Sequence, residues 1–251
     1  MKKQTAKPLG YTVDDAEIAK FAAMAEEWWD PNGKFKPLHK FNPVRLEFIR
    51  DRLCAKFDKD PKSVKPLQGL RILDIGSGGG LLAEPLARMG ADMVGIDATE
   101  RSVEIAKAHA KAQEVEIDYR FTTAEDMVLA GEKFDAVMNM EVIEHVADVG
   151  AFIKASAALI KTDGLMFMAT LNRTPKSYAL AIIGAEYVMG WLPRGTHDWK
   201  KFIKPSEIAA HLRQANIHIS ELTGITYSPF QDEWALNAND LGVNYMIVAQ
   251  K

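Results

Sequence analysis

The chain of 251 residues contains a single cysteine, Cys54, which excludes an intrachain disulfide and a zinc site built on several cysteines. Basic residues are not in excess: the formal net charge is −3, whereas a nucleic-acid-binding domain usually carries a basic face. No apolar run approaches the roughly 18 residues that a membrane span requires, and none of signal-peptide length follows the basic N-terminus. These absences favour a cytoplasmic protein that binds no nucleic acid.

The chain also lacks a linker rich in glycine, serine or proline, so no such segment divides it into separate domains. Apolar residues at helical spacing predict a helix over residues 14–29 and a second helix over residues 43–57. We therefore expect a helical extension over residues 1–66, followed by one larger domain over residues 67–251. An apolar helical insertion at about residues 173–204 is expected within that domain.

Beyond residue 69, short runs rich in β-branched residues alternate with helical segments. The predicted strands cover residues 71–75, 92–96, 117–122, 134–138, 164–169, 217–226 and 243–249. The predicted helices cover residues 81–89, 101–113, 149–160, 178–191 and 205–214. This alternation indicates an α/β fold in which helices cover both faces of a mostly parallel sheet. The last two strands are expected to form an antiparallel pair that completes a seven-stranded sheet.

The first predicted strand runs into a glycine-rich turn, Gly76-Ser77-Gly78-Gly79-Gly80. Glycine lets the backbone approach a ligand closely, and the start of the next helix offers free amide donors. The dinucleotide fingerprint is not satisfied, because Leu81 stands where its third glycine belongs. Asp74, on the strand just before the turn, would repel a pyrophosphate but could hold a cationic amino group.

Asp97 ends the second predicted strand, roughly 20 residues after the turn, where an acid binds ribose hydroxyls in nucleotide-binding folds. A ligand that combines a ribose with an amino-acid ammonium and has no phosphate is S-adenosylmethionine. The alternative is that the turn binds no ligand and the acids are unrelated surface residues. That alternative does not explain why Asp74, Asp97 and the alternation of strands and helices occur together. We therefore predict an S-adenosylmethionine site that includes Asp74, Gly76, Gly78 and Asp97.

This pattern resembles the class I methyltransferases, which have a Rossmann-like fold. Residues 123–126 lie where that superfamily contacts the adenine, residues 134–141 are similar to its fourth strand, and residues 159–166 are similar to the turn before its fifth strand. The resemblance implies that Glu125 lies near the adenine and that the fourth strand runs into the active site.

Several runs outside this common core resemble one family, the ubiquinone-biosynthesis O-methyltransferases. These runs cover residues 25–39, 42–46, 140–146, 170–174, 184–187, 195–205 and 240–246. The resemblance spans nearly the whole chain. It implies methylation of phenolic hydroxyls on polyprenylated rings, 2-polyprenyl-6-hydroxyphenol and 3-demethylubiquinol, at two steps of ubiquinone biosynthesis.

The same resemblance implies that Arg45, Gly76, Asp97 and Met140 contact the cofactor. A planar guanidinium suits a cofactor carboxylate, although an arginine on a helix is more often a solvated charge. A thioether such as that of Met140 suits an adenine or a sulfonium, although a methionine at a strand end is as often part of the core.

Three residues after the fourth strand are candidates for catalysis, because a phenol with a pKa of about 10 is mostly protonated at neutral pH. A general base or a metal ion that favours the phenolate must therefore be present. Glu141, Glu144 and His145 stand at i, i+3 and i+4, so on a helical turn they would face one direction. Such a set suits Mg²⁺ or Zn²⁺, and eukaryotic members of the family resemble metal-dependent enzymes. Acids that merely complement a helix N-terminus are the alternative. We expect His145 to be the general base or a metal ligand.

The least polar stretch, residues 178–192, is followed by Arg194, Lys200, Lys201 and Lys204. An apolar helix beside a cationic segment is typical of an interfacial segment, and a polyprenyl substrate resides in the bilayer. Residues 177–199 are therefore expected either to contact the inner face of the membrane or to pack as a lid or core helix. Two other functions stay open: methylation of another small phenol, and a non-catalytic cofactor-binding subunit of a quinone-synthesis complex.

Overall fold

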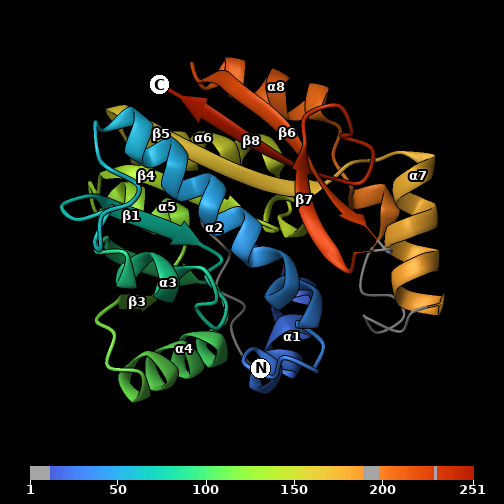
Figure 1. The fold of residues 1–251 in the computed structure, drawn as a ribbon, viewed down its shortest axis with the longest axis horizontal. Helices are drawn as coiled ribbons and strands as arrows, with labels where there is room; N and C mark the ends of the chain where they lie inside the picture. The colour runs from blue at the N-terminus through green and yellow to red at the C-terminus, as the bar shows by residue number, and fades with distance from the viewer. Residues whose placement is uncertain (1–11, 189–197, 229–230) are drawn as a thin grey trace, which may run out of the picture.

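The computed structural model describes residues 12–188, 198–228 and 231–251. Within these residues the chain forms an eight-stranded sheet with the strand order β3-β2-β1-β4-β5-β8-β6-β7 (Figure 1). The strands are β1 Arg71–Ile75, β2 Asp92–Asp97, β3 Asp118–Phe121, β4 Phe134–Met140, β5 Ile160–Leu171, β6 His218–Ser228, β7 Glu233–Asn237 and β8 Asn244–Gln250. Strands β1 to β5 are parallel, and β8 lies antiparallel between β5 and β6. The predicted α/β fold with a mostly parallel sheet is confirmed.

The eighth strand, β7, was not predicted, so the expected total of seven strands is one too few. It pairs antiparallel with β6 and forms the outer edge of the sheet. Three of its five residues are exposed, two are half-buried and none is fully buried. The alternation of apolar and polar residues that identifies a strand is therefore weak here.

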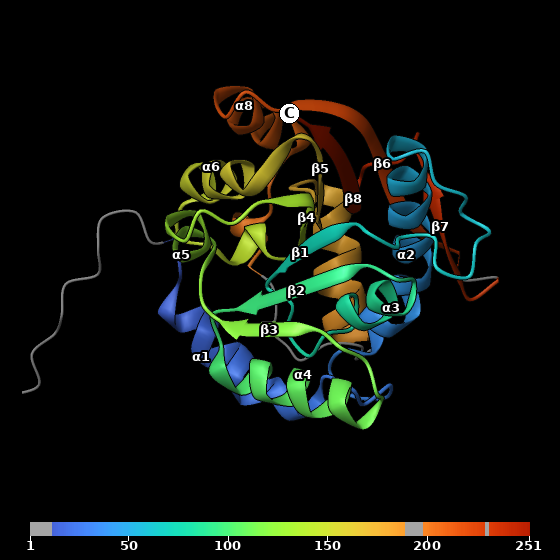
Figure 2. The ribbon, with the colours of Figure 1, turned by 90° about the vertical axis from the view of Figure 1, so that its left-hand side faces the viewer.

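Helices cover both faces of the sheet (Figure 2). The α-helices are α1 Asp15–Met24, α2 Lys36–Lys56, α3 Ala83–Arg88, α4 Glu100–Ala112, α5 Ala124–Leu129, α6 Val149–Leu159, α7 Pro175–Ser177 and α8 Pro205–Gln214. Single turns of 3₁₀-helix are η1 Ala25–Glu27, η2 Ile143–His145 and η4 Trp199–Lys201, and a π-helix, η3 Tyr178–Val188, continues α7. Helices α2, α3 and α4 pack on one face of the sheet, and α5, α6 and α8 on the other. Of these, α5 was not predicted.

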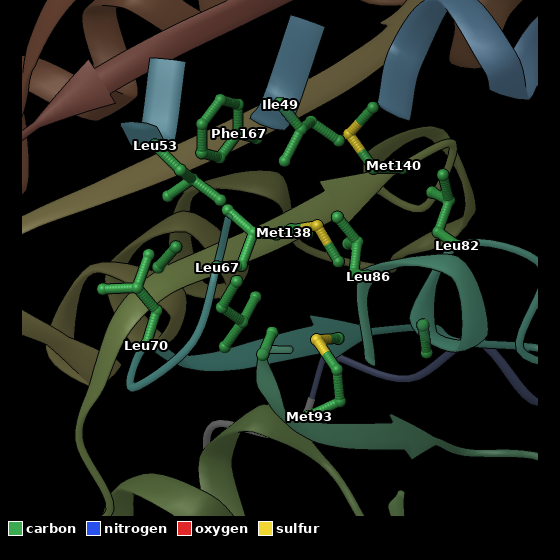
Figure 3. Close-up of a cluster of buried hydrophobic side chains, with 14 of the residues drawn as sticks. Ile49, Leu53, Leu67, Leu70, Leu82, Leu86, Met93, Met138, Met140 and Phe167 are labelled. Atoms are coloured by element: carbon green, nitrogen blue, oxygen red, sulfur yellow. The ribbon is translucent and has the colours of Figure 1, made fainter. Parts of the chain in front are cut away.

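Alternate residues of each central strand point into these two apolar layers. On β1, Ile72 belongs to the layer beneath α2 and α3, whereas Leu73 belongs to the layer beneath α5 and α6. Figure 3 shows the first layer, where Ile49 and Leu53 of α2 pack over Met138 and Phe167 of the sheet. Because both faces are covered, the central parallel strands are buried on both sides.

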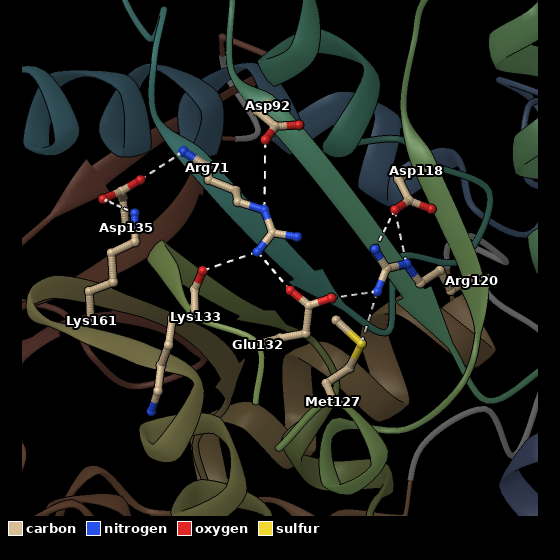
Figure 4. Close-up of polar contacts among 9 residues, drawn as sticks. All are labelled: Arg71, Asp92, Asp118, Arg120, Met127, Glu132, Lys133, Asp135 and Lys161. Carbon is tan, nitrogen blue, oxygen red and sulfur yellow. Dashed lines mark hydrogen bonds and ion pairs between the residues drawn. The ribbon is translucent and has the colours of Figure 1, made fainter. Parts of the chain in front are cut away.

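The amino ends of the parallel strands are joined by charged side chains (Figure 4). Arg71, at the start of β1, donates to Glu132 at 2.7 Å, and its backbone N–H donates to Asp135 at 2.9 Å. Arg120 of β3 donates to the other oxygen of Glu132 at 2.9 Å, and Lys161 donates to Asp135 at 2.9 Å. Ion pairs therefore join the starts of several strands at this end of the sheet.

The N-terminal extension consists of α1, η1 and α2. Asp14 caps α1 by accepting hydrogen bonds from the backbone N–H groups of Ala16 and Glu17. The helix predicted over residues 14–29 ends earlier, at Met24, and continues as the turn η1. The helix predicted from residue 43 begins earlier, at Lys36, because Pro43 is tolerated inside it at the loss of one backbone hydrogen bond.

Candidate active site

The glycine-rich turn leaves β1 and crosses the carboxyl ends of the strands. Gly76, Gly78 and Gly80 have φ angles of +72°, +54° and +91°, which side chains with a Cβ rarely adopt. A Cβ at Gly78 would collide with the ring of Trp28, and one at Gly76 with the side chain of Val142. The turn therefore needs glycine both for its backbone angles and for the close approach of neighbouring side chains.

The acid before the turn, Asp74, is 3% exposed. Burial, together with the neighbouring charge of Asp97, raises the pKa of Asp74 to about 7. A buried acid of this kind is stabilised by a cationic partner, which would favour its ionised form. The sequence likewise predicts that Asp74 holds a cationic amino group.

The acid after β2, Asp97, is held in place by backbone donors. Its two carboxylate oxygens accept hydrogen bonds from Gly78 N at 2.9 Å and from Thr99 N at 2.7 Å. Burial raises the pKa of Asp97, and these two hydrogen bonds oppose that rise. The contact from Gly78 joins the glycine turn to the acid that was predicted to bind ribose.

Both acids open into a cavity of about 1020 Å³ at the carboxyl ends of the strands. Its volume is at the upper end of the usual range for ligand pockets. The predicted site residues that line it are Arg45, Asp74, Gly76, Asp97, Glu125, Met140, Glu141, Glu144 and His145. Gly78 is not part of the lining and acts through its hydrogen bond to Asp97. The glycine turn, the two buried acids and the volume fit S-adenosylmethionine.

Arg45 enters the cavity wall from α2 and is 1% exposed. It forms an ion pair with Glu141, and its guanidinium carbon lies 4.0 Å from the centre of the Phe41 ring. Asn244 of β8 donates a second hydrogen bond to the same oxygen of Glu141 at 2.8 Å. Burial lowers the pKa of Arg45, and the charge of Glu141 opposes that change. Among the described residues the Nε atom of Arg45 has no partner, so one donor is left for a ligand.

Glu144 is buried beneath Glu141 on the turn η2. It accepts a hydrogen bond from the hydroxyl of Thr170 at 2.8 Å. Burial and the nearby charge of Glu141 raise the pKa of Glu144 well above its ordinary value. Burial thus favours the neutral form of Glu144, and a carboxyl group in that form can donate a hydrogen bond.

His145 points away from these two acids and toward the N-terminal extension. Its Nδ1 atom lies 3.0 Å from Oε2 of Glu17 on α1. The ring also meets the ring of Phe21 edge-on, with the two centres 4.9 Å apart. Glu17 was missed from the sequence, because the pairing joins residues 128 positions apart.

The predicted metal site at Glu141, Glu144 and His145 is not formed. In the described part of the chain no group of three histidine, cysteine, aspartate or glutamate side chains is arranged to hold a metal ion. The prediction assumed one helical turn over all three residues. The turn η2 covers only Ile143–His145 and is a 3₁₀-helix, and Glu141 lies before it with a φ of +56°. Glu141 and Glu144 consequently contact each other, whereas His145 pairs with Glu17.

The remaining predicted residues contribute to the cavity in two ways. Met140 is 7% exposed and belongs both to the apolar core and to the cavity wall. Glu125 accepts hydrogen bonds from the backbone N–H and the hydroxyl of Thr12 at 3.1 and 2.7 Å. The carbonyl of Thr12 accepts a hydrogen bond from Ala147 N at 2.7 Å, so the start of the described chain is fastened beside Glu125 at the cavity.

Trp28 is a further residue that the sequence did not assign to the cofactor end. It stacks on Phe35 with 3.7 Å between ring centres, and its Nε1 donates to Ser102 at 3.2 Å. It also covers the glycine turn and lines the cavity. The adjacent pair Trp28-Trp29 was a usable signal, because two neighbouring tryptophans on a helix point in different directions and each needs a surface to pack on.

The apolar helix η3 forms part of the opposite wall. Leu180 and Ile183 line the cavity and remain 53% and 46% exposed. The part of the predicted segment over residues 189–197 lies outside the described residues. None of the helices in the described part of the chain combines the length and apolar character of a membrane span.

Comparisons with known proteins agree with this geometry. Residues 73–168 match the family model described as "Methyltransferase domain". The chain is 54% identical to a ubiquinone biosynthesis O-methyltransferase of Mesorhizobium japonicum over 98% of each chain. It is 57% identical to a protein of the same name from Parvibaculum lavamentivorans, over 96% of this chain and 94% of that one.

Solved structures show the fold. Magnesium protoporphyrin IX methyltransferase of Synechocystis PCC 6803, solved with bound SAH, has a TM-score of 0.65 at 20% identity, over 93% of this chain and 95% of that one. The plantazolicin methyltransferase, in complex with a substrate analog and SAH, has a TM-score of 0.63 at 15% identity, over 94% and 97%. The chain therefore belongs to the ubiquinone biosynthesis O-methyltransferase family and is an S-adenosylmethionine-dependent O-methyltransferase.

Proposed function

We propose that this protein methylates a phenolic hydroxyl on the polyprenylated rings of ubiquinone biosynthesis, 2-polyprenyl-6-hydroxyphenol and 3-demethylubiquinol. The proposal is supported by a single cavity whose two ends differ in chemistry. The acids and the glycine turn lie at one end. The other end has an apolar wall of Phe41, Leu180, Ile183, Ile225, Tyr227 and Trp234. Such a wall suits a ring that bears an isoprenoid chain.

In this proposal residues 67–251 carry the methyltransferase domain and residues 1–66 cap its cofactor end. Bound S-adenosylmethionine supplies a methyl group activated by its sulfonium. Asp97 would accept hydrogen bonds from the ribose hydroxyls, and Asp74 would pair with the ammonium group. Glu125 would border the adenine. Arg45 would offer its free Nε donor to the cofactor carboxylate.

His145 is proposed as the general base. A phenolic hydroxyl must lose its proton before or during the attack of its oxygen on the methyl carbon. His145 lines the cavity, and histidine is the side chain that most often serves as a general base. Glu144 would form a hydrogen bond with the substrate, and Glu141 would keep Arg45 in position.

A divalent metal is the second candidate for activating the phenol. Glu141, Glu144 and His145 would have to turn toward one point, against their hydrogen bonds to Arg45, Thr170 and Glu17. The two candidates differ in their response to a chelator. With a base alone, turnover persists in chelator; with a metal, turnover is lost and returns when Mg²⁺ or Zn²⁺ is added.

The helix η3 is proposed to guide the substrate from the inner face of the membrane, with the protein otherwise in the cytoplasm. The exposed side chains of Tyr178, Leu180 and Ile183 support this contact, since they sit beside the cavity. Replacing Leu180 and Ile183 by serine should reduce co-sedimentation with anionic vesicles. Leu129 is 82% exposed on α5 and is the matched control for the loss of an exposed leucine. Equal binding by all variants would refute the membrane contact. No observation on the described residues points to a quinone-synthesis complex.

The variant His145→Ala tests the proposed chemistry. Loss of a general base lowers turnover by about 10²- to 10⁴-fold. The assay is single-turnover methyl transfer to a prenylated catechol at saturating cofactor. Turnover near that of the unmodified protein would contradict the assignment of His145.

A further inference from the structure

Glu17 is an acid of the N-terminal helix α1 that lies at the cavity although it is far in sequence from the strand ends. Its Oε2 atom is 3.0 Å from Nδ1 of His145, and its Oε1 atom is 2.8 Å from Nζ of Lys201. The side chains of Glu17 and His145 are 16% and 17% exposed. Glu17 lines the cavity together with His145. The contact therefore joins three segments that are far apart in the sequence, α1, η2 and η4.

The hydrogen bonds on Glu17 determine its charge. The contact with His145 and that with Lys201 hold the pKa of Glu17 well below its usual range, although burial opposes them. Lys201 also reaches Asp14 at 3.3 Å, so the cation is fixed from two sides. An ionised carboxylate has no proton to donate and can only accept.

An accepting carboxylate determines which nitrogen of His145 carries the proton. Since Oε2 of Glu17 can only accept, Nδ1 must be the protonated nitrogen, and Nε2 is left with its lone pair. A neutral histidine in this tautomer is ready to take a proton at Nε2. When it does so, the resulting imidazolium is stabilised by the adjacent carboxylate, as in other histidine–carboxylate pairs.

We infer that Glu17 is a positioning residue for catalysis, which fixes the ring and the tautomer of His145 so that Nε2 accepts the phenolic proton. This inference rests on the proposed role of His145. In the step, the O–H bond breaks and its proton moves to Nε2. The oxygen forms a bond to the methyl carbon, and the electron pair of the carbon–sulfur bond leaves with the sulfur. Glu17 gains and loses no proton.

Because Glu17 lies on the N-terminal extension, the tautomer of His145 depends on the docking of that extension. Thr12 is hydrogen-bonded to Glu125 and to Ala147, so the start of α1 is held on both sides of the cofactor end. The base is in its working tautomer only while this segment is docked. The extension therefore contributes to the chemical step as well as to cofactor binding.

The competing explanation is that Glu17 forms a purely structural ion pair that fastens α1. The two explanations predict different effects of Glu17→Gln on substrates whose hydroxyl groups differ in acidity. The variants are Glu17→Gln and, as matched control, Glu26→Gln. Glu26 belongs to the same extension and pairs with Arg101 at 2.7 Å, away from the cavity. Each variant is assayed with a prenylated catechol and with a nitro-substituted catechol, whose more acidic hydroxyl needs less help from a base.

We expect Glu17→Gln to lower kcat on the ordinary catechol by on the order of a hundredfold, with KM for S-adenosylmethionine unchanged within about twofold. The defect should shrink at least severalfold on the nitro-substituted catechol, and Glu26→Gln should match the unmodified protein. An equal defect on both catechols, or a rise in KM with kcat unchanged, would overturn the inference and favour the structural ion pair.

Two further measurements keep the inference separate from the proposed function and from misfolding. If His145→Ala turns over normally, the base assignment itself fails. If His145→Ala is slow and Glu17→Gln is not, only the role of Glu17 fails. The ¹⁵N chemical shifts of the His145 ring report the tautomer without any substrate. We expect a protonated Nδ1 in the unmodified protein and a mixture in Glu17→Gln, and an unchanged tautomer would overturn the inference.

Discussion

Replacing Asp74 by asparagine should stabilise the unliganded protein at neutral pH and weaken its cofactor binding. The pKa of Asp74 rises from the ordinary value of 3.8 to about 7 because the carboxyl is buried beside Asp97. Between these two values the folded chain holds a proton that the unfolded chain has lost. The free energy of unfolding therefore falls as the pH rises through this range.

The size of the effect follows from the shift of about three pKa units. At about 1.4 kcal/mol per unit, ionised Asp74 costs the folded protein about 4 kcal/mol at pH 8 relative to pH 4. Asparagine has a similar shape and does not ionise, so the variant should lack this loss. The assay is urea unfolding at pH 5 and pH 8, with the midpoint and slope fitted at each pH.

Binding of S-adenosylmethionine should change in the opposite direction. The ammonium group loses a charged acceptor, which corresponds to a rise in Kd of about tenfold to a hundredfold at pH 8. Asp92→Asn is the control, because Asp92 is exposed at the opposite end of the strands. If Asp74→Asn shows the same pH dependence of stability as the unmodified protein, the buried-acid argument is refuted.

Two further changes test the walls of the cavity. Gly78→Ala should weaken S-adenosylhomocysteine binding by calorimetry, because a residue at this positive φ costs about 1–2 kcal/mol and its Cβ meets Trp28. In the Trp28→Ala background, Gly78→Ala should cost only the part of the binding free energy that comes from the backbone angle. If the two substitutions together cost the full sum of their separate effects, the close packing of Gly78 on Trp28 is contradicted. Glu141→Ala should lower the free energy of unfolding by about 3–5 kcal/mol, since it leaves the buried Arg45 unpaired. Adding Arg45→Met should restore part of that loss in the same denaturation assay, and no recovery would show that the pair is not the cause.

The fold and the cofactor end were predictable because their signals are local. The glycine turn needs its residues at fixed neighbouring positions, and Asp97 follows it at the spacing that one strand–helix–strand unit imposes. The alternation of strands and helices is likewise a local pattern. The edge strand β7 was missed because none of its five residues is buried, which leaves little periodicity to detect.

The substrate end was less predictable because it is assembled from distant segments. The spacing of Glu141, Glu144 and His145 suggested one cluster of three. The chain has a positive φ at Glu141 and a 3₁₀ turn at residues 143–145, and only the two acids contact each other. The partner of His145 is Glu17, from the other end of the chain. No local pattern specifies such a pairing, because it depends on how the extension docks on the sheet.

The central claim is that this chain transfers a methyl group to a polyprenylated phenol, and one measurement tests it directly. The purified chain is incubated with S-adenosylmethionine and a prenylated catechol, beside an equal amount of bare catechol, and the products are analysed by mass spectrometry. The account predicts a gain of one CH₂ unit on the prenylated catechol, at a higher kcat/KM than on the bare one. No mass gain would contradict the methyltransferase assignment, and an equal rate on both catechols would contradict the polyprenylated substrate.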